Sequence, residues 1–265
     1  MTALGESTMQ HMQQEATQKR FPIAEMFTSP QGEGLYTGTL MRFIRIAGCS
    51  VGRKMKDSEE RGQWGVREEA LLNERFPLIN IYREVCTTFD GREFACDTDF
   101  STKQVLTADE IANGVGDDIE HVCITGGEPL NHNLTQLLCT LQDKGCYVHI
   151  ETSGTVSIRN AYPNFVPSDL VDISKDGWLW ITVSPKRGVL PEMISLASEV
   201  KLLIDDGFDP YCVSKEFRAK ELVYLQPING EFQISDKNMQ RCLALQKAFP
   251  HFRISLQAHK LWKVR

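Results

Sequence analysis

Residues 121–154, HVCITGGEPLNHNLTQLLCTLQDKGCYVHIETSG, decide the fold class. The stretch starts with an apolar run, HVCIT (121–125), and ends with a second, YVHIE (147–151), each short enough to be a buried strand. Between them, leucines recur at the spacing of one helix face until a glycine stops the pattern. These residues are Leu134, Leu137, Leu138 and Leu141, followed by Gly145. A strand, a helix and a strand in this order predict two parallel strands joined by a crossover helix.

The same alternation continues outward from this unit. Short β-rich runs and helical patterns alternate from residue 41 onward, which is typical of an α/β fold with a largely parallel sheet covered by helices. The strands that we expect are 41–47, 121–125, 147–151, 170–174, 179–184, 200–204, 222–225 and 253–257. Thr107 and Glu110 have the spacing of a capping box, and Ser235 is expected to cap the last helix. The apolar face of that helix is expected to include Met239, Cys242 and Leu243.

The composition of the 265 residues narrows the class of protein. Hydrophobic residues make up 42% and charged residues 24%, which excludes a disordered, collagen-like or coiled-coil chain. The net charge of -6 argues against a nucleic-acid surface that relies on bulk positive charge. No apolar run approaches the roughly 20 residues of a membrane helix, and the N-terminus lacks the apolar core of a secretory signal. We therefore expect a cytoplasmic enzyme with neither a nucleic-acid nor a membrane partner.

The chain is expected to form one main domain over residues 21–265, preceded by a polar, flexible arm over residues 1–20. The one break in composition lies at 52–85, where 14 of 34 residues are charged. A stretch this polar cannot be core, so we interpret it as a surface excursion with a short helix near 67–75. A solvated insertion without function and a functional loop are both open at this point.

The eight cysteines fall into two groups by their surroundings. Five lie in or beside apolar strand or helix patterns, where a cysteine behaves as a small hydrophobe; these are Cys123, Cys139, Cys146, Cys212 and Cys242. The other three, Cys49, Cys86 and Cys96, lie beside Gly, Thr or Asp in loop-like surroundings. Three thiolates suit an iron–sulfur cluster that leaves one iron open, whereas a closed structural zinc site has four ligands. An open iron implies that a substrate or cofactor is the missing ligand.

The segment ITGGEP (124–129) directly follows an apolar strand. Its two glycines would let a ligand approach the backbone closely, and Glu128 places a carboxylate where an ammonium group could bind. Gly-Gly before Glu-Pro is also an ordinary turn, so the segment by itself leaves both interpretations open.

Several motifs occur in an order that resembles one enzyme family. They are SPQGEG (29–34), FIRIAGC (43–49), CDTDF (96–100), TGGEP (125–129), ETSG (151–154), SPK (184–186), LQP (225–227) and LQAHK (256–260). In this order, from about Phe21 to the C-terminus, the chain resembles 7-carboxy-7-deazaguanine synthases, which are radical S-adenosylmethionine enzymes of 7-deazapurine (queuosine-type) biosynthesis. The resemblance implies a partial, modified (β/α) barrel that contracts the ring of 6-carboxy-5,6,7,8-tetrahydropterin and releases ammonia.

The resemblance also implies roles for individual residues. A 4Fe-4S cluster would be held by Cys49, Cys86 and Cys96. S-adenosylmethionine would contact Gly127, Glu128, Ser184, Pro185, Lys186 and Gln226. The pterin would contact Pro30, Gln31, Gly32, Glu33, Arg45, Thr125, His259 and the terminal carboxylate of Arg265, and Thr98 would bind Mg2+. No catalytic residue is implied beyond the cluster and the cofactor.

These assignments agree with the chemistry of the side chains. Gln31 and Glu33 can hydrogen-bond the edge of a flat heterocycle, and Arg45 can pair with a carboxylate in bidentate fashion. Magnesium is a hard ion that keeps several waters, so Thr98 and substrate oxygens could complete its shell. The resemblance further implies a homodimer and a flavodoxin-like or other electron donor. Two alternatives stay open, an activase that makes a glycyl radical in another protein and a non-catalytic zinc-binding module.

The spacing of the three cysteines departs from the usual pattern, in which two of them form a tight CxxC pair. Here 36 residues separate Cys49 from Cys86, and nine separate Cys86 from Cys96. The family tolerates an enlarged first gap. In the second gap, Asp90 and Gly91 form a turn signal that could fold the nine residues into a hairpin.

Overall fold

The computed structural model describes residues 18–54, 84–96, 98–171, 177–212, 215–229 and 234–264. Most of the expected N-terminal arm and of the charged excursion lies outside these residues, as do the helix expected near 67–75 and Arg265. None of the described helices has the length and apolarity of a membrane-spanning segment.

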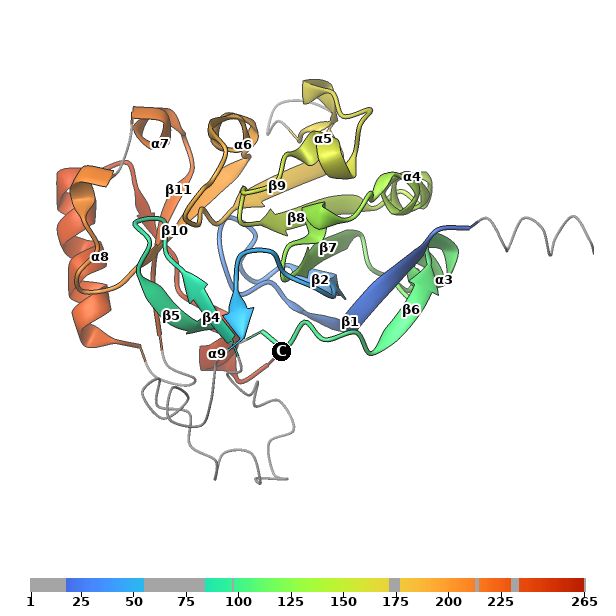
Figure 1. Cartoon of the computed structure of the whole chain (residues 1–265), viewed down its shortest axis with the longest axis horizontal. Coiled ribbons are helices and arrows are strands. Elements are labelled where there is room, and N and C mark those ends of the chain that lie inside the picture. Colours follow the sequence, from blue (N-terminus) through green and yellow to red (C-terminus); the bar gives the residue numbers. More distant parts are fainter. Residues whose placement is uncertain are drawn as a thin grey trace, which may run out of the picture.

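A nine-stranded sheet forms the centre of the molecule (Figure 1). Its strands, in spatial order, are β12 (Arg253–Ile254), β11 (Val223–Pro227), β10 (Glu199–Ile204), β9 (Leu179–Val183), β8 (Tyr147–Thr152), β7 (His121–Gly126), β2 (Leu40–Ile46), β1 (Arg20–Pro30) and β6 (Gln104–Thr107). The seven strands from β12 to β2 are parallel, whereas β1 is antiparallel to both β2 and β6. The two end strands, β12 and β6, do not pair with each other, so the sheet is an open, partial barrel, as predicted.

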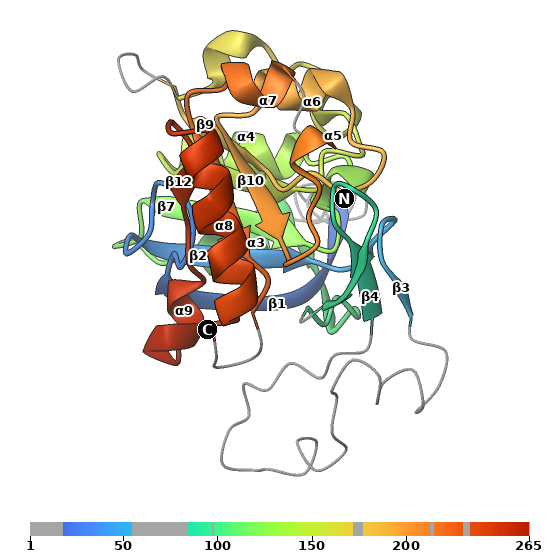
Figure 2. The ribbon, with the colours of Figure 1, turned by 90° about the vertical axis from the view of Figure 1, so that its left-hand side faces the viewer.

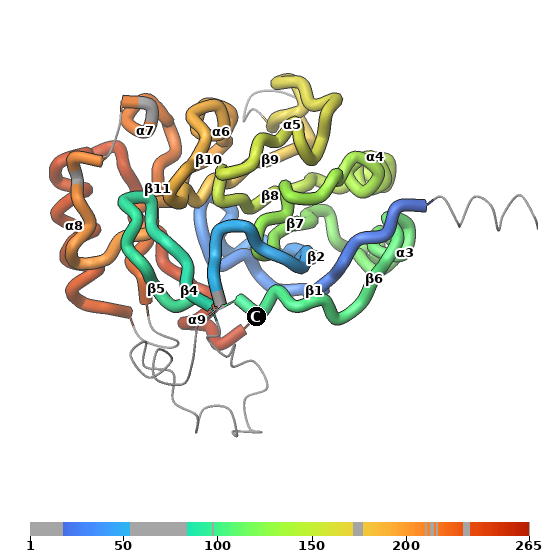
Figure 3. Tube along the Cα trace, in the orientation of Figure 1, coloured from blue at the N-terminus to red at the C-terminus, as the bar shows by residue number. Residues whose placement is uncertain are grey.

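In the described part of the chain, six helices follow one another around the outside of this sheet in chain order (Figure 3). They are α3 (Ala108–Asn113), α4 (Thr135–Asp143), α5 (Ile158–Ala161), α6 (Pro191–Leu196), α7 (Lys215–Ala219) and α8 (Asp236–Ala248), and the short α9 (Ala258–Trp262) follows β12. The expected caps are confirmed, because Thr107 and Glu110 form a capping box on α3 and Ser235 accepts a hydrogen bond from the Asn238 N–H of α8. The 3-10 turns are η2 (Pro129–Asn131), η3 (Pro167–Asp169) and η4 (Pro210–Cys212).

The strands of the large sheet have one apolar and one more polar face. In β10, Val200, Leu202 and Ile204 have no exposed surface and pack in the core with the helices. Glu199 and Lys201 alternate with them and therefore face the inside of the barrel. The outward residues of the neighbouring strands are Ile44, Ile46, Val122, Ile124, Val148, Ile150, Ile181, Val183, Val223 and Leu225. This alternation makes the outer face of the sheet the core and leaves the inner face for polar chemistry.

A second, three-stranded sheet lies apart from the large one (Figures 1 and 2). It consists of β3 (Arg53–Lys54), β4 (Glu84–Thr87) and β5 (Glu93–Cys96), all antiparallel. The hairpin predicted from Asp90 and Gly91 is confirmed, with the Thr88 N–H donating to the Arg92 carbonyl at 2.8 Å. The tip of this hairpin is docked on the main domain, because Phe89 makes an edge contact with Phe217 of α7 at 4.9 Å and Arg92 forms an ion pair with Asp205.

Several sequence-based expectations need correction. Of the strand expected at 170–174, residues 172–174 lie outside the described part and stay a prediction, while Leu170 forms an isolated bridge with Leu179. The strand expected at 253–257 ends at Ile254. Leu243 is 37% exposed, because α8 buries Cys242 and Leu245 instead. Strands β1 and β6 were not predicted at all, although β1 is the longest strand in the described residues.

Candidate active site

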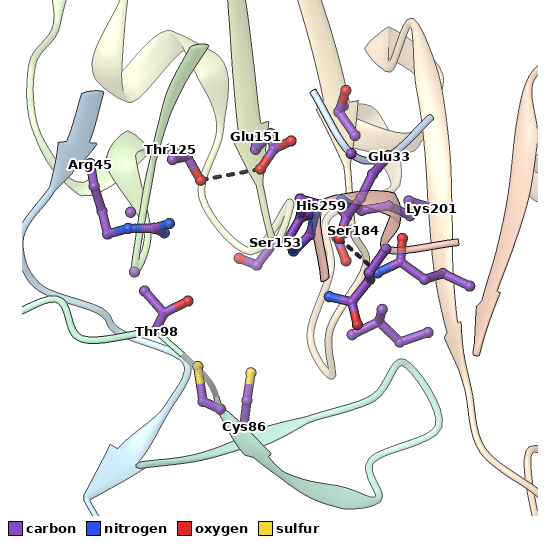
Figure 4. Close-up of a pocket in the computed structure, with 18 of the residues that line it drawn as sticks. Glu33, Arg45, Cys86, Thr98, Thr125, Glu151, Ser153, Ser184, Lys201 and His259 are labelled. Carbon is purple, nitrogen blue, oxygen red and sulfur yellow. Dashed lines mark hydrogen bonds and ion pairs between the residues drawn. The ribbon is translucent and has the colours of Figure 1, made fainter. Parts of the chain in front are cut away.

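A cavity of about 680 Å³ lies at the carboxyl ends of the parallel strands, between the large and the small sheet (Figure 4). Nearly all the residues that the sequence analysis assigned to a site line it: Pro30, Gln31, Gly32, Glu33, Arg45, Cys49, Cys86, Cys96, Thr98, Thr125, Gly127, Ser184, Lys186, Gln226 and His259. Glu128 and Pro185 are not among the lining residues. Arg265 is outside the described part of the chain, but its neighbours Lys263 and Val264 line the cavity. The assigned residues are scattered in sequence and meet in one place.

The wall of the cavity that carries Cys49, Cys86, Cys96 and Thr98 is called the thiol side below. Cys86 of β4 lies opposite Phe94 of β5, and Glu84 lies opposite Cys96. The two cysteines are therefore diagonal neighbours on one face of the hairpin, at a Cα separation of about 7–8 Å. They sit in strands rather than in the loops that we expected. The hairpin brings together two thiols that have nine residues between them in the sequence.

The third thiol, that of Cys49, lies in the loop after β2. Its Sγ accepts hydrogen bonds from the backbone N–H groups of Val51 and Gly52, both at 3.4 Å. Backbone N–H donors of this kind tune the sulfur ligands of iron–sulfur clusters. Within the described residues no three His, Cys, Asp or Glu side chains converge on a single ion site. A four-iron cluster takes one thiolate per iron, so its ligands surround it at several corners, and the donor set of this wall fits such a cluster.

The glycine-rich loop after β7 packs directly against the Cys49 loop. A Cβ atom on Gly127 would lie 2.2 Å from the Gly48 carbonyl oxygen and 2.4 Å from Cys49 Cβ, so only glycine fits there. The Glu128 N–H donates to the same Gly48 carbonyl at 3.1 Å. The loop therefore fixes where the first thiol stands.

Glu128 itself is fully buried behind the cavity wall. Its carboxylate accepts hydrogen bonds from the Thr152 hydroxyl at 2.7 Å, the Ser153 N–H at 2.9 Å and the Leu130 N–H at 3.1 Å. It also accepts one from the Ser153 hydroxyl, and Ser153 lines the cavity. In the structure Glu128 ties the loops after β7 and β8 together, and a contact with the cofactor stays a prediction.

The opposite wall carries Glu33, Glu151 and Lys201 (Figure 4). It is called the carboxylate side and also includes their hydrogen-bond partners Gln31 and Gln226. Glu33 forms an ion pair with Lys201 of β10 and accepts a hydrogen bond from Gln226 Nε2 at 3.1 Å. Glu151 of β8 accepts hydrogen bonds from Gln31 Nε2 and from the Thr125 hydroxyl, both at 3.2 Å. Burial alone would raise the pKa of Glu33, but Lys201 and His259 lower it to about 2. Glu33 is therefore ionised at neutral pH.

Two of these residues, Glu151 and Lys201, were missed in the sequence. No motif marks Lys201, and Glu151 appeared only as the first letter of ETSG. The signal that could have found them is a charged residue at an inward position of an otherwise apolar strand, as in YVHIE and VKLLI. Glu25 also lines the cavity and was not predicted.

Three other predicted residues, Arg45, His259 and Thr98, reach the cavity from different parts of the chain. Arg45 of β2 donates from Nε to Glu25 at 2.7 Å, so its guanidinium is already paired with a carboxylate. His259 lies in α9 and packs so closely on Gly32 that a Cβ there would be 2.2 Å from its Nδ1. Thr98 lies between Arg45 and Cys86 (Figure 4).

A cation lies beside the thiols. The Lys186 ammonium donates to Ser184 Oγ at 2.8 Å and lies 5.9 Å from the centre of the Phe94 ring. Burial lowers the pKa of Lys186, and the neighbouring Cys86 and Cys96 partly offset this. Lys186 thus presents a buried ammonium group to the hairpin that carries Cys86 and Cys96.

A partial barrel, with three thiols next to a glycine-rich loop at the carboxyl ends of its strands, defines an enzyme of the radical S-adenosylmethionine class. The 7-carboxy-7-deazaguanine synthase of Escherichia coli (strain K12) is 30% identical over 252 residues, covering 91% of this chain and 97% of that protein. The synthase of Synechocystis sp. is 32% identical over 254 residues, covering 92% and 94%. The crystal structure of QueE from Escherichia coli superposes with a TM-score of 0.59 at 25% identity, covering 91% and 95% of the two chains.

The chain belongs to the 7-carboxy-7-deazaguanine synthase family. No family model matches it.

Proposed function

We propose that this protein contracts the ring of 6-carboxy-5,6,7,8-tetrahydropterin to 7-carboxy-7-deazaguanine, with loss of ammonia, by radical S-adenosylmethionine chemistry. The observation that carries the proposal is that motif residues from Pro30 to His259 line one cavity together with the three thiols. The relatives, which match more than nine tenths of the chain, are named for the product. Neither alternative, the activase or the zinc module, receives support from these relatives.

The cofactors in this proposal are a 4Fe-4S cluster, held by Cys49, Cys86 and Cys96, and S-adenosylmethionine. Together they supply a 5'-deoxyadenosyl radical that takes hydrogen from the substrate. The protein's part is to bind and orient. Ser184, Lys186 and Gln226 lie on the cavity wall and can hydrogen-bond a cofactor, and Gly127 lines the same cavity beside the Cys49 loop.

The carboxylate side holds the pterin in the proposed complex. Ionised Glu33 accepts hydrogen bonds from ring and amino N–H groups, Gln31 offers an amide, and Arg45 pairs with the substrate carboxylate. The polar wall residues are largely buried, with Gln31 at 8% and Thr125 at 6% exposure. A rigid, dry wall keeps the substrate fixed while a reactive centre exists on it.

Mg2+ bound by the Thr98 hydroxyl and the substrate carboxylate completes the proposed site, and the terminal carboxylate of Arg265 is proposed as a further substrate contact. The position of Thr98 between Arg45 and Cys86 supports the first assignment (Figure 4). The lining residues Lys263 and Val264, directly before Arg265, support the second. Thr98→Val should weaken the response of activity to added magnesium and leave binding of S-adenosylmethionine unchanged.

A homodimer, a flavodoxin-like or other external electron donor and a cytoplasmic location are the remaining parts of the proposal. Sedimentation of the reconstituted protein tests the dimer, and reduction of the cluster by purified flavodoxin tests the donor.

The decisive experiment incubates reconstituted protein anaerobically with the tetrahydropterin, S-adenosylmethionine and a reductant, followed by mass analysis. The expected product is 7-carboxy-7-deazaguanine, formed with many turnovers per cofactor molecule. Substrate deuterated at carbon 6 should pass label into S-adenosylmethionine. Stoichiometric 5'-deoxyadenosine without returned label would contradict the proposed cycle and favour an activase.

A further inference from the structure

Lys201 is a buried cation on the inner face of the barrel, at a position that no motif marks. It lies in β10, one residue from Val200 and Leu202, which face the core. Alternation therefore turns its side chain into the cavity, where it is 5% exposed and forms the ion pair with Glu33. An ammonium group taken out of water in this way is stable only with a paired charge.

Glu33 is held from two neighbouring strands. Its Oε2 accepts from the Lys201 ammonium of β10, and its Oε1 accepts from Gln226 Nε2 of β11 at 3.1 Å. The neutral side chain of Gln257, which also lines the cavity, is a third hydrogen-bond donor to Glu33. A carboxylate has about four lone-pair sites, so three protein donors leave about one for a ligand. A heterocycle with two adjacent N–H groups can donate to that site and take the place of the Gln257 amide at a second one.

The chemical group that fits two acceptor sites on one carboxylate is an amidine-like edge with a ring N–H beside an amino N–H. A 2-amino-4-oxopyrimidine ring has this edge, whereas its 2,4-dioxo analogue presents a carbonyl in place of the amino group. A neutral carboxylic acid would accept less strongly and would present a proton of its own. The charge state of Glu33 therefore decides which ring can bind.

We propose that Lys201 is a positioning residue that keeps Glu33 ionised and oriented, and that the pair thereby selects ligands with a 2-amino-4-oxopyrimidine edge. The inference rests on the proposed function, because it takes the pterin as the ligand of this wall. It adds a residue and a basis for specificity that the family motifs do not contain.

The other groups around the pair leave Lys201 as the main counter-charge of Glu33. Lys186 of the loop after β9 and Cys123 of β7 interact with both members of the pair. His259 of α9 and the side chain of Gln257 interact with Glu33, and Glu151 of β8 and Glu199 of β10 interact with Lys201. Without Lys201, burial would raise the pKa of Glu33. Ligand affinity would then fall as the pH is lowered, because the protonated form gains population.

The test measures binding of two stable probes, 6-carboxypterin and 6-carboxylumazine, to the reconstituted enzyme with S-adenosylmethionine between pH 6 and pH 8. Wild-type protein is expected to bind the pterin at least about tenfold more tightly at every pH, because the 2,4-dioxo ring leaves a buried acceptor unpaired. In Lys201→Met, pterin affinity should fall on the order of 10- to 100-fold at pH 6 and recover partly toward pH 8, and the preference over the lumazine should shrink. Lys201→Arg keeps the charge and should keep the flat pH response.

Two further variants guard against a trivial effect on folding. Lys201→Met with Glu33→Gln removes both buried charges, and it should fold, bind the pterin weakly and show no pH dependence. Lys144→Met removes a surface ion pair with Asp117, of 3.1 Å, and serves as the matched lysine control with wild-type affinity.

The outcomes separate the inference from the proposed function. Wild-type pterin turnover together with unchanged affinity and a flat pH response in Lys201→Met would overturn the inference alone. A double variant that keeps the wild-type preference would also overturn it. Wild-type protein that neither binds nor converts the pterin would overturn the proposed function, and the role of Lys201 with it.

Discussion

The two walls of the cavity are built in different ways. Glu151 and Lys201 of the carboxylate side project from strands of the nine-stranded sheet, so strand register and a buried core behind them fix their places, while Gln31 and Glu33 lie in the loop after β1. The thiol side stands on a loop and on a three-stranded sheet, whose hairpin is tied to the main domain at its tip. Register in the large sheet fixes the strand residues of the carboxylate side, whereas the thiol side depends on how a loop and a separate small sheet dock on the main domain. Substitutions should therefore act differently on the two walls.

The largest expected effect concerns Cys86, whose separation from the other two cysteines departs from the usual spacing. Cys86→Ala should abolish cluster binding as completely as Cys49→Ala or Cys96→Ala, because an open cluster needs all three thiolates. Cluster binding is measured as iron and sulfide per chain and as visible absorbance after anaerobic reconstitution.

The controls for this prediction are cysteines outside the cavity wall. Cys123→Ala and Cys242→Ala should keep normal iron and sulfide, since both are buried in apolar clusters. A Cys86 variant with normal iron, sulfide and cofactor cleavage would show that another ligand takes its place.

The second-largest effect is expected from the contact between the hairpin tip and the main domain. Arg92→Leu removes the ion pair with Asp205, which is partly exposed, so the loss in unfolding free energy should be about 1 kcal/mol. Cluster content should fall several-fold all the same, because Cys86 and Cys96 would no longer be held at a fixed distance from Cys49. Iron content and the EPR signal of the reduced cluster measure this loss.

A matched control for Arg92 lies on the same small sheet. Arg53→Leu breaks the exposed ion pair with Glu93, of 2.9 Å, and should leave iron content unchanged. Equal iron content in the Arg92 and Arg53 variants would mean that the tip contact does not position the thiols.

Sequence patterns predicted the sheet where alternation is regular and failed where it is interrupted. The β7, α4 and β8 unit was predicted from apolar periodicity because its outward residues pack in one continuous core. Strand β1 was missed because it carries Pro22 and Pro30 and a register shift between Ile23 and Glu25, which interrupts alternation. Its length and its pairing with both β2 and β6 follow from tertiary structure.

The site was predicted to the extent that its residues lie in motifs. Gln31, Glu33 and Thr125 were found in this way and line the cavity, whereas Lys201 was missed because its only signal is its inward position in a strand. The Asp90-Gly91 turn indicated the hairpin between Cys86 and Cys96, but no local pattern could show where its tip would dock.

Lowering the pH should reduce the unfolding free energy through His149, a buried histidine next to the carboxylate side. His149 lies under the loop that carries Glu33, in edge contact with Tyr36 at 4.6 Å and 2.9 Å from a nitrogen of His121. Burial, and then His121, lower the pKa of His149 to about 3, so the folded protein resists a proton that the unfolded chain takes up near pH 6.5. The unfolding free energy should therefore fall by about 2 kcal/mol from this residue between pH 7 and pH 5.

Denaturant titrations at both pH values measure this contribution. His149→Gln should flatten the dependence by about that amount, while the matched variant His251→Gln, at an exposed position, should retain it. A wild-type slope in the His149 variant would assign the acid sensitivity to other groups.

The smallest effect is expected from the charged excursion, because 14 of the 34 residues of 52–85 are charged and so polar a stretch cannot be core. Lys54 and Glu84, which flank this segment, are cross-strand partners in the small sheet, so their Cα atoms are about 5 Å apart and a Gly/Ser linker of about eight residues can join them. The shorter loop should raise the unfolding free energy by about 1 kcal/mol, since each halving of loop length recovers about 0.6 kcal/mol of closure entropy. Iron content, pterin affinity and turnover should stay at wild-type values if the segment is a solvated insertion. Lost turnover with an intact cluster and normal pterin binding would instead assign the excursion to reduction of the cluster or to closure over the bound substrate.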